Sequence, residues 1–251
     1  MAEQSYPIAE CFESPQGEGL FAGSLMCFLR LAGCNVGKPY TAEEKKLLPN
    51  SSPYQEKCSS WEGNVCFECD TDFRTKYRAT IEFILKEPLI ANAKRVCLTG
   101  GEPLIHDLKP LATALALAGK KVHIETSGTK PLTVLRLTPQ ERLRRSNNEL
   151  ETFAERALER SLWITVSPKK DYLPESLELA DEIKVLVGEN FNETLFLQHF
   201  ERYINSDKFW IQPINDEFTV RMENVKRCLE LQQKYKSLRI STQAHKFWNV
   251  R

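Results

Sequence analysis

The sequence has no long apolar run. No stretch approaches the roughly 20 residues that a membrane-spanning helix needs. The first residues, MAEQSYPIAECFES, also lack the basic and then apolar pattern of a secretory signal peptide. We therefore expect a cytoplasmic protein with no membrane partner.

An excess of either charge is also absent. Lys plus Arg and Asp plus Glu both number 34, so the formal net charge is zero. This balance argues against a nucleic-acid groove as the main site, and we expect no nucleic-acid partner. There is no internal repeat and no low-complexity tract. With 41% hydrophobic residues, enough to fill a sizeable core, we expect one domain over 1–251.

Cysteine, in contrast, is abundant, with eight residues at uneven spacing. A cytoplasmic protein keeps its thiols reduced, so this pattern favours a metal site plus scattered thiols over a set of disulfides. Four of the cysteines lie in or near apolar strands or helices, and we expect them to be buried thiols. They are Cys11, Cys27, Cys97 and Cys228.

The other four cysteines lie in the stretch 28–73. An apolar strand over 26–31 ends at Gly33, and Cys34 follows directly. Cys66 and Cys69 form a C-x2-C pair, which lets two sulfurs face one soft metal centre. Three thiolates suit an iron–sulfur cluster that keeps one iron without a protein ligand. We interpret this stretch as the active centre.

Cys58 leaves an alternative open. It lies within the 31 residues that separate Cys34 from Cys66. It is either a thiol with no metal or a fourth ligand, and four cysteines could close a structural zinc site on a non-enzymatic protein. The length of the gap does not forbid a shared site, because the entropy of loop closure grows only logarithmically with length.

Apolar strands alternate with helices along the rest of the chain. We expect strands over 96–98, 122–124, 163–166, 183–187, 209–211 and 238–242, and helices over 80–89, 108–115 and 220–235. This order predicts an α/β fold with parallel β/α units. About six units indicate a partial, open β/α barrel, with a long insertion in the cysteine stretch.

Polar residues gather where these strands end. The segments are Thr-Gly-Gly-Glu-Pro at 99–103, Glu-Thr-Ser-Gly at 125–128, Ser-Pro-Lys-Lys at 167–170, Gln-Pro at 212–213 and Gln-Ala-His-Lys at 243–246. In parallel sheets the carboxyl edge is where ligands bind. The paired glycines allow a close backbone approach, and Glu102 is placed to meet an amino group. The turn-rich segment 14–19 is either a surface loop or a loop over a ligand, contacting it through Gln16 and Glu18.

Two segments are predicted insertions, 36–65 and 138–160. The second opens with Thr138-Pro139-Gln140-Glu141, a capping box with proline at the first helical position. An apolar stripe follows, made of Leu150, Phe153, Ala154, Ala157 and Leu158. We expect a solvated helix lying on the barrel, with a subunit contact as the alternative.

Taken together, the motifs resemble those of radical S-adenosylmethionine (SAM) enzymes, and among them the 7-carboxy-7-deazaguanine synthase family of the queuosine pathway. The matching pieces are the QGEG loop at 16–19, FLRLAGCN at 28–35, C-x2-C-D-T at 66–71, TGGEP, ETSG, SPK, QP and the closing His245-Lys246. They follow in family order over almost the whole chain. The departure is the 31-residue gap, since most radical SAM proteins have three residues there.

The resemblance implies a site residue by residue. Cys34, Cys66 and Cys69 are expected to hold one 4Fe-4S cluster, whose open iron takes the amino and carboxylate groups of SAM. The expected SAM site comprises Gly100, Gly101, Glu102, Ser127, Ser167, Lys169 and Gln212. The expected site for the pterin substrate comprises Gln16, Glu18, Arg30, Thr99 and His245. Thr71, beside Asp70, is expected to place Mg2+.

The resemblance also implies an activity. The expected reaction converts 6-carboxy-5,6,7,8-tetrahydropterin to 7-carboxy-7-deazaguanine with loss of ammonia, which makes the protein a carbon–nitrogen lyase. A flavodoxin-like electron donor and a homodimer are the expected partners. An alternative in the same class is a glycyl-radical-activating enzyme, which gives no reason for Arg30, Thr71 and His245 to converge.

Overall fold

The computed structural model describes residues 4–39, 43, 46, 56–62, 66–69, 73–141, 152–215 and 220–248. For residues 38, 39, 56, 57 and 66–68 it describes the backbone only. Asp70 and Thr71 lie outside the described residues, as do most of the first predicted insertion and residues 142–151 of the second.

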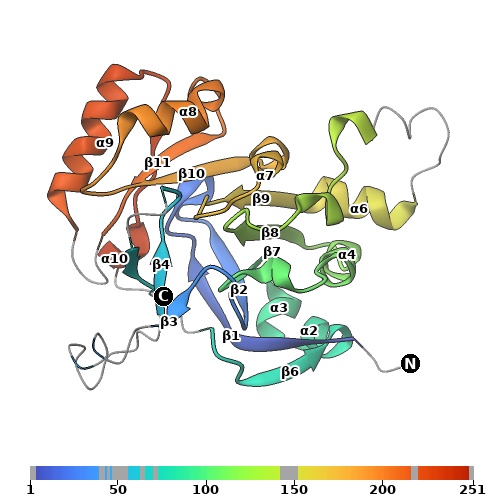
Figure 1. Ribbon diagram of the computed structural model, residues 1–251. Coiled ribbons are helices and arrows are strands. Elements are labelled where there is room, and N and C mark those ends of the chain that lie inside the picture. Colours follow the sequence, from blue (N-terminus) through green and yellow to red (C-terminus); the bar gives the residue numbers. More distant parts are fainter. Residues whose placement is uncertain are drawn as a thin grey trace.

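Nine strands form one mixed sheet in the described part of the chain, in the order β12-β11-β10-β9-β8-β7-β2-β1-β6 (Figure 1). The strands are β1 (Ser5–Pro15), β2 (Leu25–Leu31), β6 (Tyr77–Thr80), β7 (Arg95–Gly100), β8 (Lys121–Thr126), β9 (Leu162–Val166), β10 (Glu182–Val187), β11 (Phe209–Pro213) and β12 (Arg239–Ile240). From β2 through β12 every pairing is parallel, whereas β1 pairs antiparallel with both β2 and β6. The predicted α/β class with a mostly parallel sheet is confirmed.

Helices connect the parallel strands and cover the sheet. They are α2 (Ile81–Lys86), α3 (Pro88–Asn92), α4 (Lys109–Leu117), α6 (Phe153–Ser161), α7 (Pro174–Leu179), α8 (Glu193–Ile204), α9 (Met222–Lys234) and α10 (Ala244–Trp248). Short 3-10 turns are η1 (Gly19–Phe21), η2 (Pro103–Ile105) and η3 (Leu132–Val134). In α4, which overlaps the helix predicted over 108–115, Leu111, Ala112 and Leu115 recur at helical spacing and are fully buried.

The sequence analysis missed β1 and β6. The segment Ser5–Pro15 contains two prolines and several polar residues, which weaken a strand signal. Tyr6 and Ile8 are nevertheless buried, because β1 lies between β2 and β6 in the sheet and these two side chains join the main apolar core. The last predicted strand, over 238–242, is shorter than expected and comprises only Arg239–Ile240.

Two predicted helices also need correction. The helix expected over 80–89 ends at Lys86, and a second helix starts at Pro88, because proline takes the first helical position easily but breaks the interior of a helix. In the second insertion, Thr138 and Glu141 make the predicted capping contacts, but α6 has a capping box of its own at Thr152 and Glu155. Phe153 does not join a buried stripe, since it lies in the first turn of α6 and is 75% exposed.

A short second sheet lies over the main one. It consists of β3 (Lys38–Pro39), β4 (Glu56–Ser59) and β5 (Cys66–Glu68), in the order β3-β4-β5. Strands β3 and β4 belong to the first predicted insertion and β5 follows it directly, so the insertion has regular structure in the part described.

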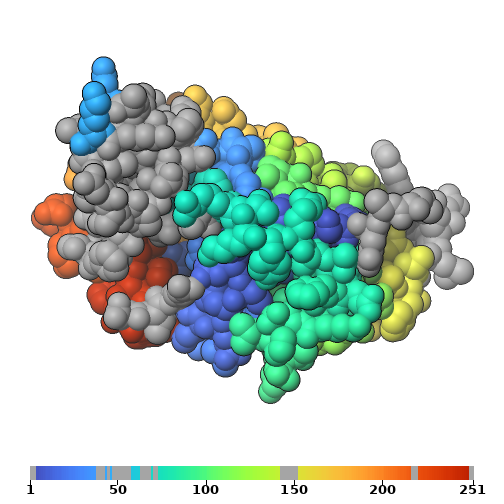
Figure 2. Space-filling view, turned by 90° about the horizontal axis from the view of Figure 1, so that it is seen from below, coloured from blue at the N-terminus to red at the C-terminus, as the bar shows by residue number. Residues whose placement is uncertain are grey.

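The main sheet curls, so that the β1–β2 connection meets strands far along the chain. Leu20 N donates to Glu182 on β10, and Gly19 N donates to Ser241 after β12. Ala244 N donates to Gly17 O at 2.8 Å. Figure 2 accordingly shows the N-terminal segment between the C-terminal segment and the segment of β6, α2 and α3. Within the described residues, no helix is long and apolar enough to cross a membrane.

Candidate active site

A cavity of about 290 Å³ opens at the carboxyl edge of the parallel strands, a size that suits small molecules. Thirteen of the residues expected from the sequence line it. They are Gln16, Glu18, Arg30, Cys34, Cys69, Thr99, Gly100, Gly101, Ser127, Ser167, Lys169, Gln212 and His245. The strand ends therefore meet as the parallel topology predicted.

The Cys34 turn packs directly against the glycine turn after β7. Leu31 pairs with Gly100 at the ends of β2 and β7, and Glu102 N donates to Gly33 O at 3.1 Å. A Cβ on Gly101 would lie 2.6 Å from Cys34 Cβ and would overlap Gly33 O. Glycine is therefore required at 101 for the two turns to come together.

Two backbone N–H groups point at the Cys34 sulfur. Val36 N and Gly37 N lie 3.4 and 3.5 Å from Cys34 Sγ. Backbone N–H groups placed in this way can hydrogen-bond a sulfur that ligates a metal centre. The strand end thus presents a sulfur prepared for ligation.

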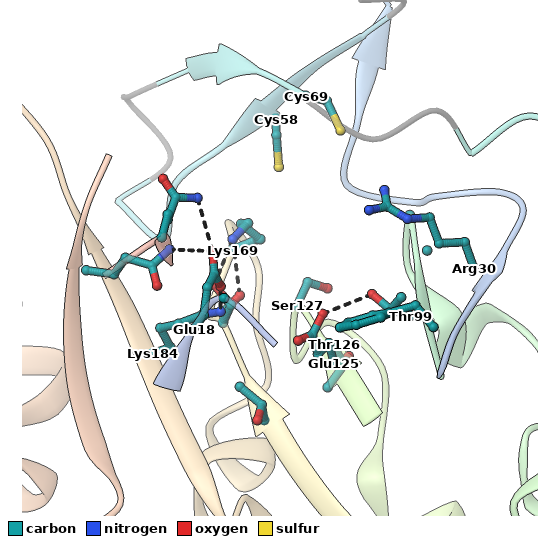
Figure 3. Close-up of a pocket in the computed structure, with 18 of the residues that line it drawn as sticks. Glu18, Arg30, Cys58, Cys69, Thr99, Glu125, Thr126, Ser127, Lys169 and Lys184 are labelled. Atoms are coloured by element: carbon teal, nitrogen blue, oxygen red, sulfur yellow. Dashed lines mark hydrogen bonds and ion pairs between the residues drawn. The ribbon is translucent and has the colours of Figure 1, made fainter. Parts of the chain in front are cut away.

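Cys58 and Cys69 bring two more sulfurs to the cavity. Both point into it from the side of the insertion (Figure 3), and Cys58 is buried. The side chain of Cys66 is not described, but its backbone on β5 pairs with Ser59 on β4, the residue after Cys58. Among the described side chains, no three His, Cys, Asp or Glu residues are grouped closely enough to hold a metal ion.

The remaining cysteines are distributed as the sequence indicated, with one exception. Cys27, Cys97 and Cys228 are fully buried, whereas Cys11 is only partly buried and its sulfur lies 3.8 Å from that of Cys27. None of the seven cysteines whose side chains are described forms a disulfide.

A second group of contacts surrounds Ser127 and Lys169. Lys169 Nζ donates to Ser167 Oγ at 3.0 Å, and Lys169 N donates to Ser127 O at 3.2 Å. Burial lowers the pKa of the Lys169 ammonium. This side of the cavity combines hydroxyl groups with a half-buried cation, which suits a polar ligand carrying a carboxylate.

Glu102 lies behind this group and does not line the cavity. It is fully buried and accepts hydrogen bonds from Leu104 N at 3.0 Å, Thr126 Oγ1 at 2.8 Å and Ser127 N at 2.7 Å, and a further one from Ser127 Oγ. In this geometry its carboxylate fixes the turn after β8, and through it the position of Ser127.

Opposite, Glu18 is held by three donors. Gln212 Nε2 and Gln243 Nε2 each donate to Glu18 Oε1 at 3.0 Å, and Lys184 Nζ donates to Oε2. Burial alone would raise the pKa of Glu18, but the charge and hydrogen bond of Lys184, with His245 and Gln243, lower it to about 2. Burial alone would lower the pKa of Lys184, but the negative charges of Glu18 and Glu125 outweigh burial and raise this pKa above its usual value. Both groups are therefore charged at neutral pH.

Glu125 joins two of the expected substrate residues. Gln16 Nε2 donates to Glu125 Oε1 at 2.9 Å, and Thr99 Oγ1 donates to Oε2 at 3.1 Å. Arg30 lies on the same side of the cavity, with its guanidinium over the Phe12 ring at 5.2 Å. Its Nε is buried without a hydrogen-bond partner among the described residues, 3.7 Å from Glu10 Oε2. An anionic ligand in the cavity would complete the hydrogen bonding of this guanidinium.

Comparison with known proteins decides the family. The chain is 30% identical to a 7-carboxy-7-deazaguanine synthase from Escherichia coli (strain K12), over 98% of this chain and 99% of that protein. It is 29% identical to the synthase of the same name from Aquifex aeolicus, over 97% and 94%. The crystal structure of QueE from Escherichia coli superposes with a TM-score of 0.60 at 28% identity, covering 96% of this chain and 95% of that one. No family model matches.

The chain belongs to the 7-carboxy-7-deazaguanine synthase family.

Four cavity residues of this family member were given no role by the sequence. Glu125 and Gln243 are expected only as members of the strand-end segments at 125–128 and 243–246, with no role of their own. Cys58 has two open interpretations, and nothing in the sequence indicates Lys184. Lys184 lies inside an apolar strand, Ile183 to Val187, and only its buried contact with a carboxylate 166 residues away reveals its place.

Proposed function

We propose that this synthase-family member converts 6-carboxy-5,6,7,8-tetrahydropterin to 7-carboxy-7-deazaguanine with loss of ammonia, as a radical SAM lyase. The sheet would form the partial, open β/α barrel of that class within a single domain over 1–251. The observation that carries the proposal is the convergence of sulfurs, polar strand ends and the Gln16–Glu18 loop on one cavity. The full-length similarity to synthases of that name supports it.

The residues present fit a 4Fe-4S cluster held by Cys34, Cys66 and Cys69. The support is the pair of backbone N–H groups at Cys34 Sγ and the contact between the Cys34 turn and Gly101, which leaves no room for a side chain. When bound, the cluster and SAM supply a radical that removes hydrogen from C6 of the pterin.

The chain's own groups would orient SAM from four strand ends, those of β7, β8, β9 and β11. The backbone at Gly100 and Gly101 can approach its methionine part closely, and Ser127, Ser167, Lys169 and Gln212 offer polar contacts. Lys169 is the natural partner for the SAM carboxylate, because it is a half-buried cation at the cavity wall. Glu102 would act from behind by holding Ser127.

The substrate would lie between Arg30 and Glu18. Arg30 has a planar fork and a buried Nε that no described residue bonds, which suits the pterin carboxylate. Glu18 stays ionised and can accept from pterin N–H groups, with Gln16, Thr99 and His245 completing the contacts. Glu125, which holds Gln16 and Thr99, joins this set as an acceptor.

We further propose the remaining partners that the family resemblance implies. Mg2+ would be placed by Thr71 and shared with the substrate, since hard oxygen ligands suit that ion. A flavodoxin-like protein would supply the electron. The enzyme would act as a homodimer in the cytoplasm, with no nucleic-acid or membrane partner.

Anaerobic turnover tests the proposed function. The protein is reconstituted with iron and sulfide, reduced, and incubated with SAM, Mg2+ and 6-carboxy-5,6,7,8-tetrahydropterin. We expect a deazaguanine chromophore and one 7-carboxy-7-deazaguanine per pterin consumed. Cleavage of SAM without a ring-contracted product would contradict the proposal. Zinc in place of iron in the same sample would favour the alternative of a structural zinc site made by four cysteines.

A further inference from the structure

The insertion between Cys34 and Cys66 is fastened to the main sheet by one tryptophan. Trp61 is 4% exposed, although it lies in a polar segment. Its indole Nε1–H donates to the backbone carbonyl of Leu186 on β10 at 3.0 Å. A buried indole with its N–H satisfied is a strong local anchor, because it combines a large apolar area with one directed bond.

An aromatic pocket on α8 receives the indole ring. Trp61 packs edge to face against Phe200 and Phe196 of α8 and against Phe191, which precedes the helix. The ring centroids are 5.1, 6.4 and 6.3 Å apart, respectively. The next residue of the insertion, Glu62, accepts from Asn192 N at 2.9 Å. The insertion therefore docks on β10 and α8, across the cavity from the strand β2 that it leaves.

The anchor lies close to the thiols. Cys58 is three residues before Trp61 on β4 and lines the cavity, as does Leu186. Strand β4 pairs with β5 so that Ser59 faces Cys66. Cys69 follows β5 and points into the same cavity (Figure 3). Whatever fixes the insertion at Trp61 therefore fixes the β4–β5 hairpin and the C-x2-C pair.

We propose that Trp61 is a positioning residue that holds Cys66 and Cys69 over the cavity where Cys34 lies. A gap of 31 residues gives the C-x2-C pair far more conformational freedom than a gap of three, and the docked indole removes much of it. The assignment of these cysteines as cluster ligands rests on the proposed function, whereas the docking of the insertion does not.

Thiol accessibility in the iron-free, full-length chain tests the anchor without any cluster. Iodoacetamide labelling of Cys58, followed by mass spectrometry, is compared for wild type, Trp61→Ala, Trp61→Phe and the control Trp210→Ala. Trp210 lies on β11, with the Arg239 guanidinium over its ring. Cys228, fully buried on α9, reports global unfolding in every sample.

We expect Cys58 to be labelled about tenfold faster in Trp61→Ala than in wild type, with Cys228 unchanged. Trp61→Phe keeps an aromatic ring but loses the hydrogen bond to Leu186, so its rate of Cys58 labelling should lie between those of wild type and Trp61→Ala. Trp210→Ala should match wild type at Cys58. Equal Cys58 rates in wild type and Trp61→Ala would overturn the anchor, as would a parallel rise at Cys58 and Cys228.

Release of iron to a chelator, measured on reconstituted protein, tests the link to the ligands. We expect Trp61→Ala to lose iron about tenfold faster than wild type and Trp210→Ala. Equal rates would overturn the positioning role. If wild type holds no iron at all, the proposed function fails, while the labelling result still decides whether Trp61 anchors the insertion.

Discussion

At the scale of single residues, Arg30 and Glu18 place opposite charges on two sides of one cavity. The guanidinium of Arg30 has a buried Nε without a hydrogen-bond partner in the described part of the chain, whereas the carboxylate of Glu18 is bonded by three donors. Arg30 therefore still has a donor to offer to a ligand, whereas the Glu18 carboxylate already accepts three hydrogen bonds.

Arg30→Ala should lower kcat/KM for the pterin about 30- to 100-fold, because a charge-assisted, bidentate contact is lost. Arg30→Lys keeps the charge but not the planar fork of the guanidinium, so its kcat/KM should lie between those of wild type and Arg30→Ala. Steady-state kinetics measure the effect, with the cluster absorbance as control. Loss of that absorbance in Arg30→Ala would give Arg30 a structural role instead.

Glu18 predicts a pH dependence of stability. Its pKa is about 2 in the folded protein, below the ordinary 4.5, so its stabilising contribution is complete above pH 4.5 and is lost as the pH falls towards 2. Between pH 5 and pH 3, wild type should lose about 2 kcal/mol of unfolding free energy that Glu18→Gln does not lose. Urea titrations of both proteins measure the difference. Identical pH profiles would show that Glu18 is not held ionised.

The sequence could predict which side chains gather at one edge of the sheet, because parallel topology brings the carboxyl ends of the strands together. What each side chain does there depends on contacts that no local pattern encodes. Glu102 shows this, since the motif places it beside the cavity whereas its bonds to Thr126 and Ser127 bury it. Lys184 shows the converse, since an apolar strand concealed a buried cation.

At the scale of elements, the meeting of the β2 and β7 turns depends on Gly101. In Gly101→Ala the new Cβ would press on Gly33 O and Cys34 Cβ, so the turns should separate and the cluster should bind less well. We expect at least a roughly twofold drop in iron bound per chain after reconstitution, measured by metal analysis. Gly119→Ala is the control for backbone strain without overlap, because its φ is +77° but no neighbouring atom of the described residues lies within 4 Å of its Cβ. Equal iron in both variants would contradict the packing argument.

The contact between the QGEG loop and α10 gives a second prediction. A Cβ on Gly17 would overlap the imidazole of His245, so Gly17→Ala should destabilise the protein by about 1–3 kcal/mol and impair pterin turnover. The Cβ of His245 would also lie only 2.8 Å from the new Cβ, so glycine rather than alanine is needed at 245 to remove the overlap. In Gly17→Ala/His245→Gly stability should recover although activity does not. Thermal unfolding of the single and double variants measures this coupling. Additive losses would show that the two residues do not meet.

The parallel strands and the helices α4 and α9 were predictable because apolar runs and helical stripes coincide with buried strands and faces, whereas α7, α8 and α10 were not expected. Strand β1 was not, since Pro7 and Pro15 and its polar residues obscure a strand that the surrounding chain nevertheless buries. The end of α2 near Pro88 could be predicted to within a residue or two, but the start of a second helix, α3, at Pro88 could not.

At the scale of the whole molecule, the site is closed by segments that are far apart in sequence. The β1–β2 connection bonds to Glu182 and Ser241, and the C-terminal segment bonds to Gly17. Trp61 joins the insertion to β10 and α8. Such contacts depend on how the sheet curls, which strand order alone does not specify, so the closure of the cavity was beyond sequence reasoning.

The central claim is that Cys34, Cys66 and Cys69 hold a 4Fe-4S cluster whose open iron takes SAM. Electron–nuclear double resonance on the reduced protein, with SAM carrying 15N in its amino group and 17O in its carboxylate, tests it most directly. The account predicts hyperfine coupling of both labels to the cluster, lost when Cys34, Cys66 or Cys69 is replaced by alanine but kept in Cys58→Ala. A cluster signal with no coupling to either label, or one that needs Cys58, would contradict it.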